Sequence, residues 1–284
     1  MVYNSFSDRA DVPVCRKDIK MVIDFHVHAF NPKIAQRAIG QLAANCGTEP
    51  LTDGLIETTV QRMDEWGVDK AVLLSIATKP TQQRIINDWA AAQDRERFIP
   101  FMALHPQAED WREELDHALS LGLKGLKLHP DYQHFYADDE SFDEFYDALS
   151  EKGVPVLFHS GFDPVSPEKV HCSPDRALRL IKKHPQMKII LAHWGGNFMY
   201  NEVLEKLAGV GGEVYFDTAF GNACPDDMAE KIISRHGAER ILFASDCPWD
   251  NAKLIKEKIL RLPISDDKKE LIIGKNSERL LGLV

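Results

Sequence analysis

The sequence predicts an α/β fold of the (β/α)8, or TIM, barrel type, in a single domain with its functional site at the carboxyl ends of the strands. Short apolar runs rich in Val, Ile, Leu and Phe alternate with longer segments of helical periodicity, the pattern of βα units on a parallel sheet. There are eight such runs, the number that closes a barrel, and several of them end in His or Asp. The length of 284 residues is close to the roughly 250 at which such barrels form one domain.

The predicted strands give the order of the units. They cover residues 21–28, 70–76, 98–105, 125–129, 155–159, 188–193, 213–217 and 241–246. Apolar residues at three- and four-residue spacing predict helices over 58–66, 81–95, 110–121, 141–152, 174–184, 201–207 and 225–236, with 251–262 and 266–281 as a closing pair. We therefore expect residues 21–284 to form the barrel and the polar residues 1–20 to be an N-terminal extension. Residues 31–55 are interpreted as a long loop over the active face, with a lid or substrate-contacting role.

Composition and charge argue against several classes of partner. The 34 basic and 44 acidic residues give a formal net charge of −10, so the chain lacks the basic footprint that nucleic acid or an anionic membrane requires. No apolar run approaches the roughly 18 residues of a membrane span, and the first twenty residues lack the apolar stretch of a signal peptide. The five cysteines are scattered without a CxxC pair, which is typical of reduced thiols. We expect a cytoplasmic protein that acts on a small molecule, with a homo-oligomer left open.

The first predicted strand ends in the strongest local signal, Asp24-Phe25-His26-Val27-His28. Because alternate side chains of a strand point the same way, Asp24, His26 and His28 should share the face that looks into the barrel, with the intervening apolar residues against the helices. Two imidazoles two residues apart at a strand end can hold one divalent cation. An isolated HxH pair is equally compatible with hydrogen-bonded or exposed histidines.

Three other predicted strands end in a residue type that binds metals. Apolar runs lead into His159, His193 and Asp246. Ionisable side chains at the carboxyl ends of barrel strands converge on the rim where barrel active sites are built. Several converging polar groups destabilise a protein core unless each has a hydrogen-bond partner or a bound ion. The repetition of such residues at the strand ends therefore predicts a metal site.

These segments resemble the amidohydrolase superfamily, and more closely its amidohydrolase-related branch of metal-dependent barrel hydrolases and decarboxylases. The matching segments, in the family's order, are IDFHVH at 23–28, GLKLHP at 125–130, HSG at 159–161, LAHWGG at 191–196, ASDCPW at 244–249 and GKNSERLL at 274–281. They span nearly the whole chain. The resemblance implies that His26, His28, His159 and Asp246 bind metal, and that His193 binds a second metal or acts on the substrate.

The resemblance also bears on the number of metal ions. Relatives with two metals bridge them with a carboxylated lysine or a glutamate at the end of the fourth strand, and Lys127 is near that place. Lys127 is equally compatible with a charged rim residue or a contact for a substrate carboxylate. We expect one divalent ion rather than two, zinc in the first place, with manganese or iron as alternatives.

The expected chemistry follows from the metal. A bound divalent cation lowers the pKa of its water toward about 7 and polarises a carbonyl. Asp246 would accept a proton from that water, and His193 would orient the water or stabilise a developing oxyanion. His129, Trp194 and Trp249 flank the motif ends and are the expected substrate contacts, although a rim histidine is as readily a structural hydrogen-bond partner and a barrel aromatic a core residue.

Four functions remain to be compared. The first is a metal-dependent hydrolase acting on an amide, ester or lactone of a small carboxylated molecule, and the second is a nonoxidative decarboxylase on the same scaffold. A metal-dependent nuclease also opens with a histidine pair on a barrel, but the acidic balance of the chain disfavours it. A barrel that binds a ligand without catalysis is disfavoured by the full set of expected ligand types. The hydrolase is the main prediction and the decarboxylase the alternative.

Overall fold

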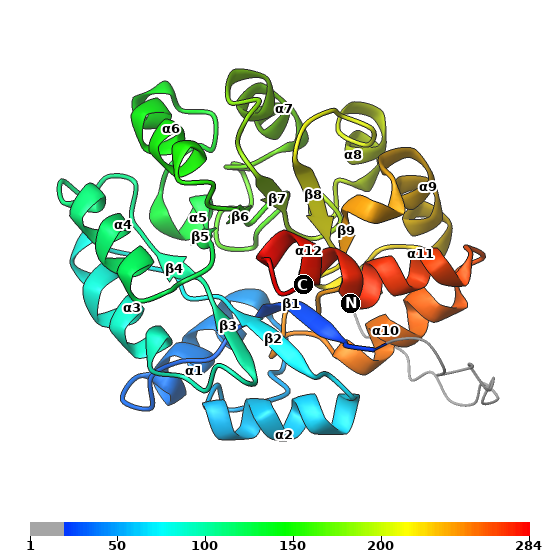
Figure 1. Ribbon diagram of the computed structural model, residues 1–284, viewed down its shortest axis with the longest axis horizontal. Coiled ribbons are helices and arrows are strands. Elements are labelled where there is room, and N and C mark those ends of the chain that lie inside the picture. Colours follow the sequence, from blue (N-terminus) through cyan, green and yellow to red (C-terminus); the bar gives the residue numbers. More distant parts are fainter. Residues whose placement is uncertain (1–19) are drawn as a thin grey trace.

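The computed structural model describes residues 20–284, and the N-terminal extension predicted for residues 1–20 lies outside them except for Lys20. Parallel strands form a ring with helices around it (Figure 1). Each of the eight predicted runs contains a strand, and the third contains two, β3 and β4, separated by Phe101. The strands are β1 (Ile23–Val27), β2 (Lys70–Leu73), β3 (Phe98–Pro100), β4 (Met102–Ala103), β5 (Leu126–Leu128), β6 (Val156–Phe158), β7 (Ile189–Leu191), β8 (Val214–Asp217) and β9 (Ile241–Leu242). The predicted TIM-barrel fold is confirmed.

The ring consists of two parallel sheets rather than one continuous ladder. Strands β1 to β3 form one sheet and β4 to β9 the other, each in sequence order. Backbone hydrogen bonds join the sheets at both seams. Lys124 N–H, just before β5, donates to the Pro100 carbonyl of β3 at 3.1 Å, and Phe25 N–H donates to the Phe243 carbonyl at 2.8 Å between β1 and the segment after β9. Beyond the strand ends, the seam continues from His28 N–H to the Cys247 carbonyl at 2.7 Å.

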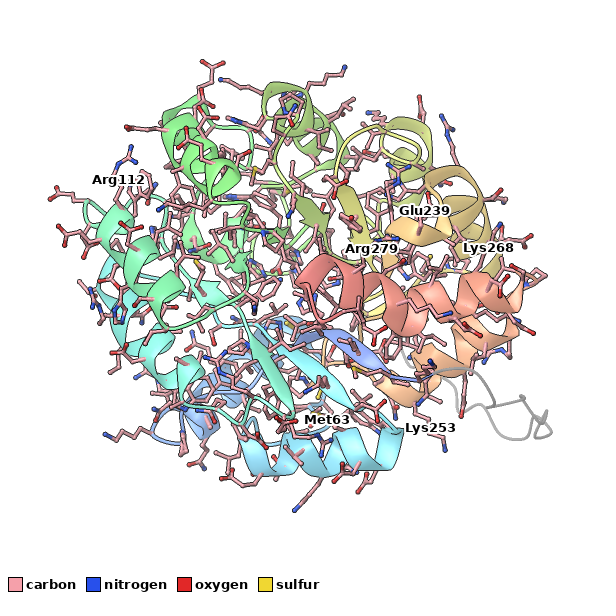
Figure 2. All side chains as sticks on the ribbon, in the orientation of Figure 1. Met63, Arg112, Glu239, Lys253, Lys268 and Arg279 are labelled. Atoms are coloured by element: carbon pink, nitrogen blue, oxygen red, sulfur yellow. The ribbon has the colours of Figure 1, made fainter. Side chains whose placement is uncertain are left out.

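The helices lie around the outside of the ring, except for the last helix, which lies across one end of it (Figure 1). They are α1 (Ala35–Cys46), α2 (Ile56–Trp66), α3 (Gln83–Ala91), α4 (Trp111–Ser120), α5 (Pro130–Gln133), α6 (Asp143–Glu151), α7 (Pro174–Lys183), α8 (Tyr200–Lys206), α9 (Asp226–His236), α10 (Ala252–Arg261), α11 (Asp266–Glu270) and α12 (Asn276–Leu281). Charged side chains such as Arg112, Lys253 and Lys268 are exposed on this outer layer (Figure 2). Among residues 20–284, no helix combines the length and apolar character needed to cross a bilayer.

The interpretation of residues 31–55 as a loop is wrong, because this segment contains helix α1. The helix buries only Ala35 and Ile39 fully, so its apolar periodicity is weak, and Gly40 lies in its middle. Its carboxyl end still reaches the active face. Cys46, the last residue of α1, forms a hydrogen bond with Tyr132, in α5 after β5.

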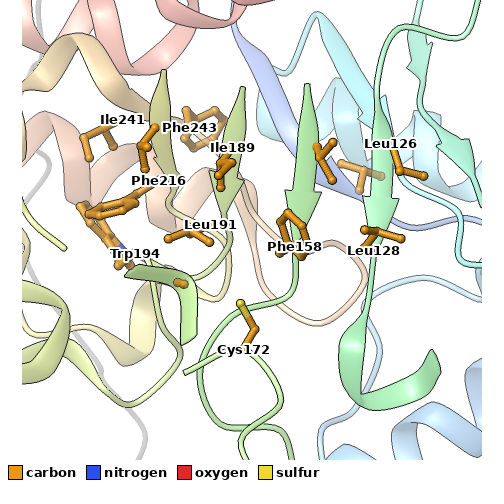
Figure 3. Packing of buried hydrophobic residues seen from close by; sticks show 14 of the residues in the cluster. Leu126, Leu128, Phe158, Cys172, Ile189, Leu191, Trp194, Phe216, Ile241 and Phe243 are labelled. Atoms are coloured by element: carbon orange, nitrogen blue, oxygen red, sulfur yellow. The ribbon is translucent and has the colours of Figure 1, made fainter. Parts of the chain in front are cut away.

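The strand side chains separate into two apolar clusters. Alternate residues such as Leu128, Phe158 and Leu191 face the helices and form the helix-facing cluster (Figure 3). The residues between them, such as Leu157 and Ile190, form an interior cluster inside the ring. The interior cluster includes Leu281 of α12, which closes the amino-terminal end of the ring (Figure 1).

The alternation of side chains between the two faces of strand β1 is interrupted halfway along the strand. Asp24 pairs with Ala71 and Val27 with Leu73, so three steps along β1 match two along β2, as in a β-bulge. Before the bulge, Phe25 belongs to the interior cluster and packs edge-on against Phe101, with ring centroids 5.6 Å apart. The prediction that Asp24 shares a face with His26 and His28 is therefore wrong. Asp24 turns away from the ring and accepts hydrogen bonds from the Ser245 backbone and hydroxyl at 2.8 and 2.5 Å.

Candidate metal centre and active site

The polar side chains expected at the strand ends lie together at the carboxyl end of the ring, opposite α12. His26 lies in β1 and His28 directly after it, Lys127 lies in β5, and His159 follows β6. His193 follows β7 and Asp246 follows β9, both with left-handed backbone, at φ 60° and 72°. Such a conformation costs of order 1–3 kcal/mol in a residue other than glycine and is concentrated at functional sites.

His26, His28 and Asp246 form a triangle of donor atoms. The two histidine Nε2 atoms are 3.2 Å apart, and Asp246 Oδ1 is 3.4 Å from that of His26 and 3.2 Å from that of His28. Ligands placed tetrahedrally at about 2.0–2.1 Å from an ion are about 3.3–3.4 Å from one another. The three edges match this spacing, so the residues fit a divalent metal ion.

Hydrogen bonds on the far side of each imidazole hold the triangle in place. His26 Nδ1 is 2.8 Å from Asp217 Oδ2, and His28 Nδ1 is 2.9 Å from the Leu74 carbonyl oxygen. Both contacts leave Nε2 directed at the centre, which is the usual arrangement of metal-binding histidines. Burial, together with nearby Lys127 and His28, lowers the pKa of His26 well below its usual value, so the imidazole is neutral, as a ligand must be.

Lys127 lies against the triangle. Its Nζ is 3.1 Å from His26 Nε2, and its side chain is among the largest that are fully buried. Burial lowers the pKa of Lys127 to about 8, against the opposing effect of Asp246 and Asp217. The lysine is therefore within reach of any ion or substrate held at the triangle.

His159 and His193 form a second unit beside the triangle. His193 Nε2 is 3.0 Å from His159 Nδ1, and His193 Nδ1 is 3.2 Å from the Ala219 carbonyl oxygen. Burial lowers the pKa of His193 to about 4. Of the four ligands that the resemblance implied, His159 alone is not part of the triangle.

His159 belongs instead to a group with His129 and Asp163. The Nε2 atoms of both histidines are 3.5 Å from Asp163 Oδ2. Their rings are stacked, with centroids 4.2 Å apart and planes at 9°. Since a metal must lie near the plane of each imidazole that binds it, two parallel stacked rings cannot direct their lone pairs at one ion. This group therefore suits hydrogen bonding and recognition of a polar group better than metal binding, and burial raises the pKa of Asp163 to about 6.

The three residues expected to contact the substrate, Trp194, Trp249 and His129, lie in different surroundings. Trp194 is fully buried in the helix-facing cluster beside Phe216 and does not reach the donor atoms (Figure 3). Trp249 is partly buried, and its backbone N–H donates to the Asp246 carbonyl at 2.8 Å. His129 is at the site, stacked between His159 and Tyr132.

Two site carboxylates were not identified from the sequence. Asp217 ends the predicted strand 213–217, so a strand-ending acidic residue was visible as a signal. Asp163 lies four residues beyond His159 in a loop, and no periodicity marks it. Both are buried, with 0% and 5% of their surface exposed.

A ring of parallel strands with this donor set at its carboxyl end defines a barrel protein with a candidate divalent-metal centre. The chain belongs to the amidohydrolase family, because the family model described as Amidohydrolase matches residues 23–283. The predicted resemblance is confirmed.

The comparisons also find decarboxylases. By sequence, the chain is 24% identical to gamma-resorcylate decarboxylase from Rhizobium sp., over 80% of this chain and 87% of that one. By structure, it is similar to 2,6-dihydroxybenzoate decarboxylase from Rhizobium, with a TM-score of 0.72, 22% identity and coverage of 93% and 99% of the two chains. It is also similar to a dihydroxybenzoic acid decarboxylase from Polaromonas sp., solved with manganese and the inhibitor 2-nitroresorcinol, with a TM-score of 0.68, 20% identity and coverage of 93% and 97%. These matches favour the alternative prediction, a decarboxylase, over a hydrolase.

Proposed function

We propose that this protein is a metal-dependent nonoxidative decarboxylase that acts on a hydroxy-substituted aromatic or enol carboxylic acid. The observation that carries the choice of reaction is the match to gamma-resorcylate decarboxylase along most of both chains. The reaction breaks the bond between carbon and the carboxylate, releases CO2, and places a proton on the carbon.

His26, His28 and Asp246 would hold the divalent ion. When bound, the ion supplies Lewis-acid polarisation of a substrate oxygen. Manganese is the first ion to test, because the Polaromonas relative was solved with it, and the expectation of zinc stands as the alternative.

The residues around the triangle would desolvate the substrate and hold it. His26, Lys127 and His193 are 1%, 1% and 3% exposed. A carboxylate bound among such buried groups loses hydration, which favours departure of neutral CO2. The Lys127 ammonium, 3.1 Å from His26 Nε2, would attract the carboxylate on entry.

His193 and His159 would handle the proton. The Ala219 carbonyl fixes a proton on His193 Nδ1, so His193 Nε2 is the atom that exchanges a proton with His159 Nδ1, 3.0 Å away. We propose that this pair delivers the incoming proton to the substrate carbon. Asp246, assigned from the sequence as the base of a hydrolase, would then act as a metal ligand.

The test compares two substrate panels on manganese- and zinc-loaded protein. We expect CO2 release from a hydroxybenzoic acid and no hydrolysis of amides, esters or lactones. His193→Asn should retain the metal and lose most CO2 release. Hydrolysis of a lactone or amide without CO2 release from any acid would overturn the proposal in favour of the hydrolase.

A further inference from the structure

Asp217, at the end of β8, contacts both units of the candidate centre. Its side chain is fully buried. One oxygen, Oδ2, is 2.8 Å from His26 Nδ1. The other, Oδ1, accepts the backbone N–H of His193 at 2.8 Å and of Ala219 at 3.0 Å. A single carboxylate thus connects the triangle with the turn that carries His193.

We infer that Asp217 is a positioning residue that sets the tautomer of His26 and fixes the backbone of His193. Lys127 Nζ, 3.1 Å from His26 Nε2, donates to that atom, so the imidazole proton lies on Nδ1 and is donated to Asp217 Oδ2, while Oδ1 accepts the two backbone N–H groups. Nε2, the atom in the triangle, then presents its lone pair. The inference rests on the metal site of the proposed function and not on the reaction.

The second oxygen of Asp217 holds an unusual turn. His193 and Trp194 both have left-handed backbone, with φ of 60° and 59°. The hydrogen bond from His193 N–H to a buried carboxylate helps to fix this conformation, and with it the position of Nε2 against His159. Loss of the carboxylate should therefore affect both units.

The variant Asp217→Asn separates hydrogen-bond polarity from shape, because asparagine has nearly the same size. Its oxygen is needed by the N–H groups of His193 and Ala219, so its NH2 group faces His26 Nδ1. Since NH2 only donates, His26 must move its proton to Nε2, which can then no longer bind a metal. We expect the affinity for manganese and zinc to fall about 10- to 100-fold, as for other partners of metal-bound histidines.

The experiment measures metal affinity by titration and the His26 tautomer by 15N NMR of the metal-free protein, with the His26 signals assigned from a His26→Gln spectrum. Wild type should have Nδ1 protonated and Asp217→Asn should have Nε2 protonated. Asp24→Asn is the matched control, because Asp24 is also a buried strand carboxylate that accepts backbone N–H groups, those of His26 and Ser245, but contacts no imidazole ring, and the variant should keep the wild-type tautomer and affinity.

The outcomes distinguish the two proposals. Wild-type protein that binds neither ion at the triangle would overturn the metal site itself. Metal binding by wild type together with unchanged affinity and an unchanged tautomer in Asp217→Asn would overturn the role of Asp217 alone. If Asp217→Asn does not fold, the wild-type spectrum decides: protonated Nδ1 supports the inference and protonated Nε2 refutes it.

Discussion

Replacement of Gly161 by alanine should disturb the candidate site through the backbone. Gly161 follows β6 with φ of 89° and bridges to Asn197, in the loop after β7. A Cβ at this position would lie 2.0 Å from the Asn197 nitrogen and 2.5 Å from the Gly196 carbonyl carbon. The two loops also carry His159 and His193, so moving the loops apart to relieve the clash would separate the imidazole pair.

The expected loss of stability in Gly161→Ala is the sum of two free-energy costs. A left-handed φ costs alanine about 1–2 kcal/mol. Overpacking against backbone adds about 1–3 kcal/mol. We therefore expect Gly161→Ala to lower the free energy of unfolding by about 2–5 kcal/mol, measured by urea denaturation. A displacement of about 1 Å within the site can cost about 100-fold in rate, measured as CO2 release.

Gly211→Ala is the matched control. Gly211 is also a loop glycine, but a Cβ there meets no heavy atom within 4 Å. The control should stay within about 0.5 kcal/mol of wild type. If Gly161→Ala were as stable and as active as Gly211→Ala, the argument that this close approach positions the pair would be refuted.

Three other outcomes are expected. His236 Nε2 donates to the Val214 carbonyl at 3.0 Å, and burial holds the pKa of His236 at about 3. Because the unfolded-state pKa is about 6.5, the unfolded chain binds the proton first as the pH falls. The contribution of His236 to the free energy of unfolding is therefore complete above pH 6.5 and is lost toward pH 3 by about 1.4 kcal/mol per pH unit. In urea denaturation between pH 7 and pH 5, the free energy of unfolding of His236→Gln should fall with pH less steeply than that of wild type by this amount. Removal of the metal by a chelator should lower the free energy of unfolding by about 2.7 kcal/mol relative to protein with metal at 100 times its Kd, and equal Tm values with and without metal would contradict the site. Ser173→Ala removes the side chain that caps α7 and should cost about 1 kcal/mol in the same denaturation assay.

Much of the site could be predicted because its residues end apolar strands. The runs before His159, His193 and Asp246 are buried on both faces, so they read as strands, and a polar residue at the end of each must lie at the rim. Asp217 also ends a predicted strand, and the same pattern places it at the rim.

The rest depended on contacts that no local pattern encodes. The choice of His159 as a fourth ligand came from resemblance, whereas its ring stacks on His129 and approaches Asp163, a loop residue. Trp194 follows a site histidine directly, but the left-handed turn at both residues sends its indole into the helix-facing cluster. Helix α1 was missed because it is held by few buried residues.

The bulge in β1 lets one short strand supply both the barrel interior and the candidate metal centre. Before it, Phe25 fills the barrel interior, and after it His26 and His28 reach the centre from the same side. Side chains alternate with a period of two, so a regular strand that keeps Phe25 inside the ring would point His26 and His28 at the helices, and the extra residue of the bulge turns them back to the centre. Deletion of Phe25 would remove the bulge and restore regular alternation with both histidines still facing the centre, at the cost of the contact between Phe25 and Phe101.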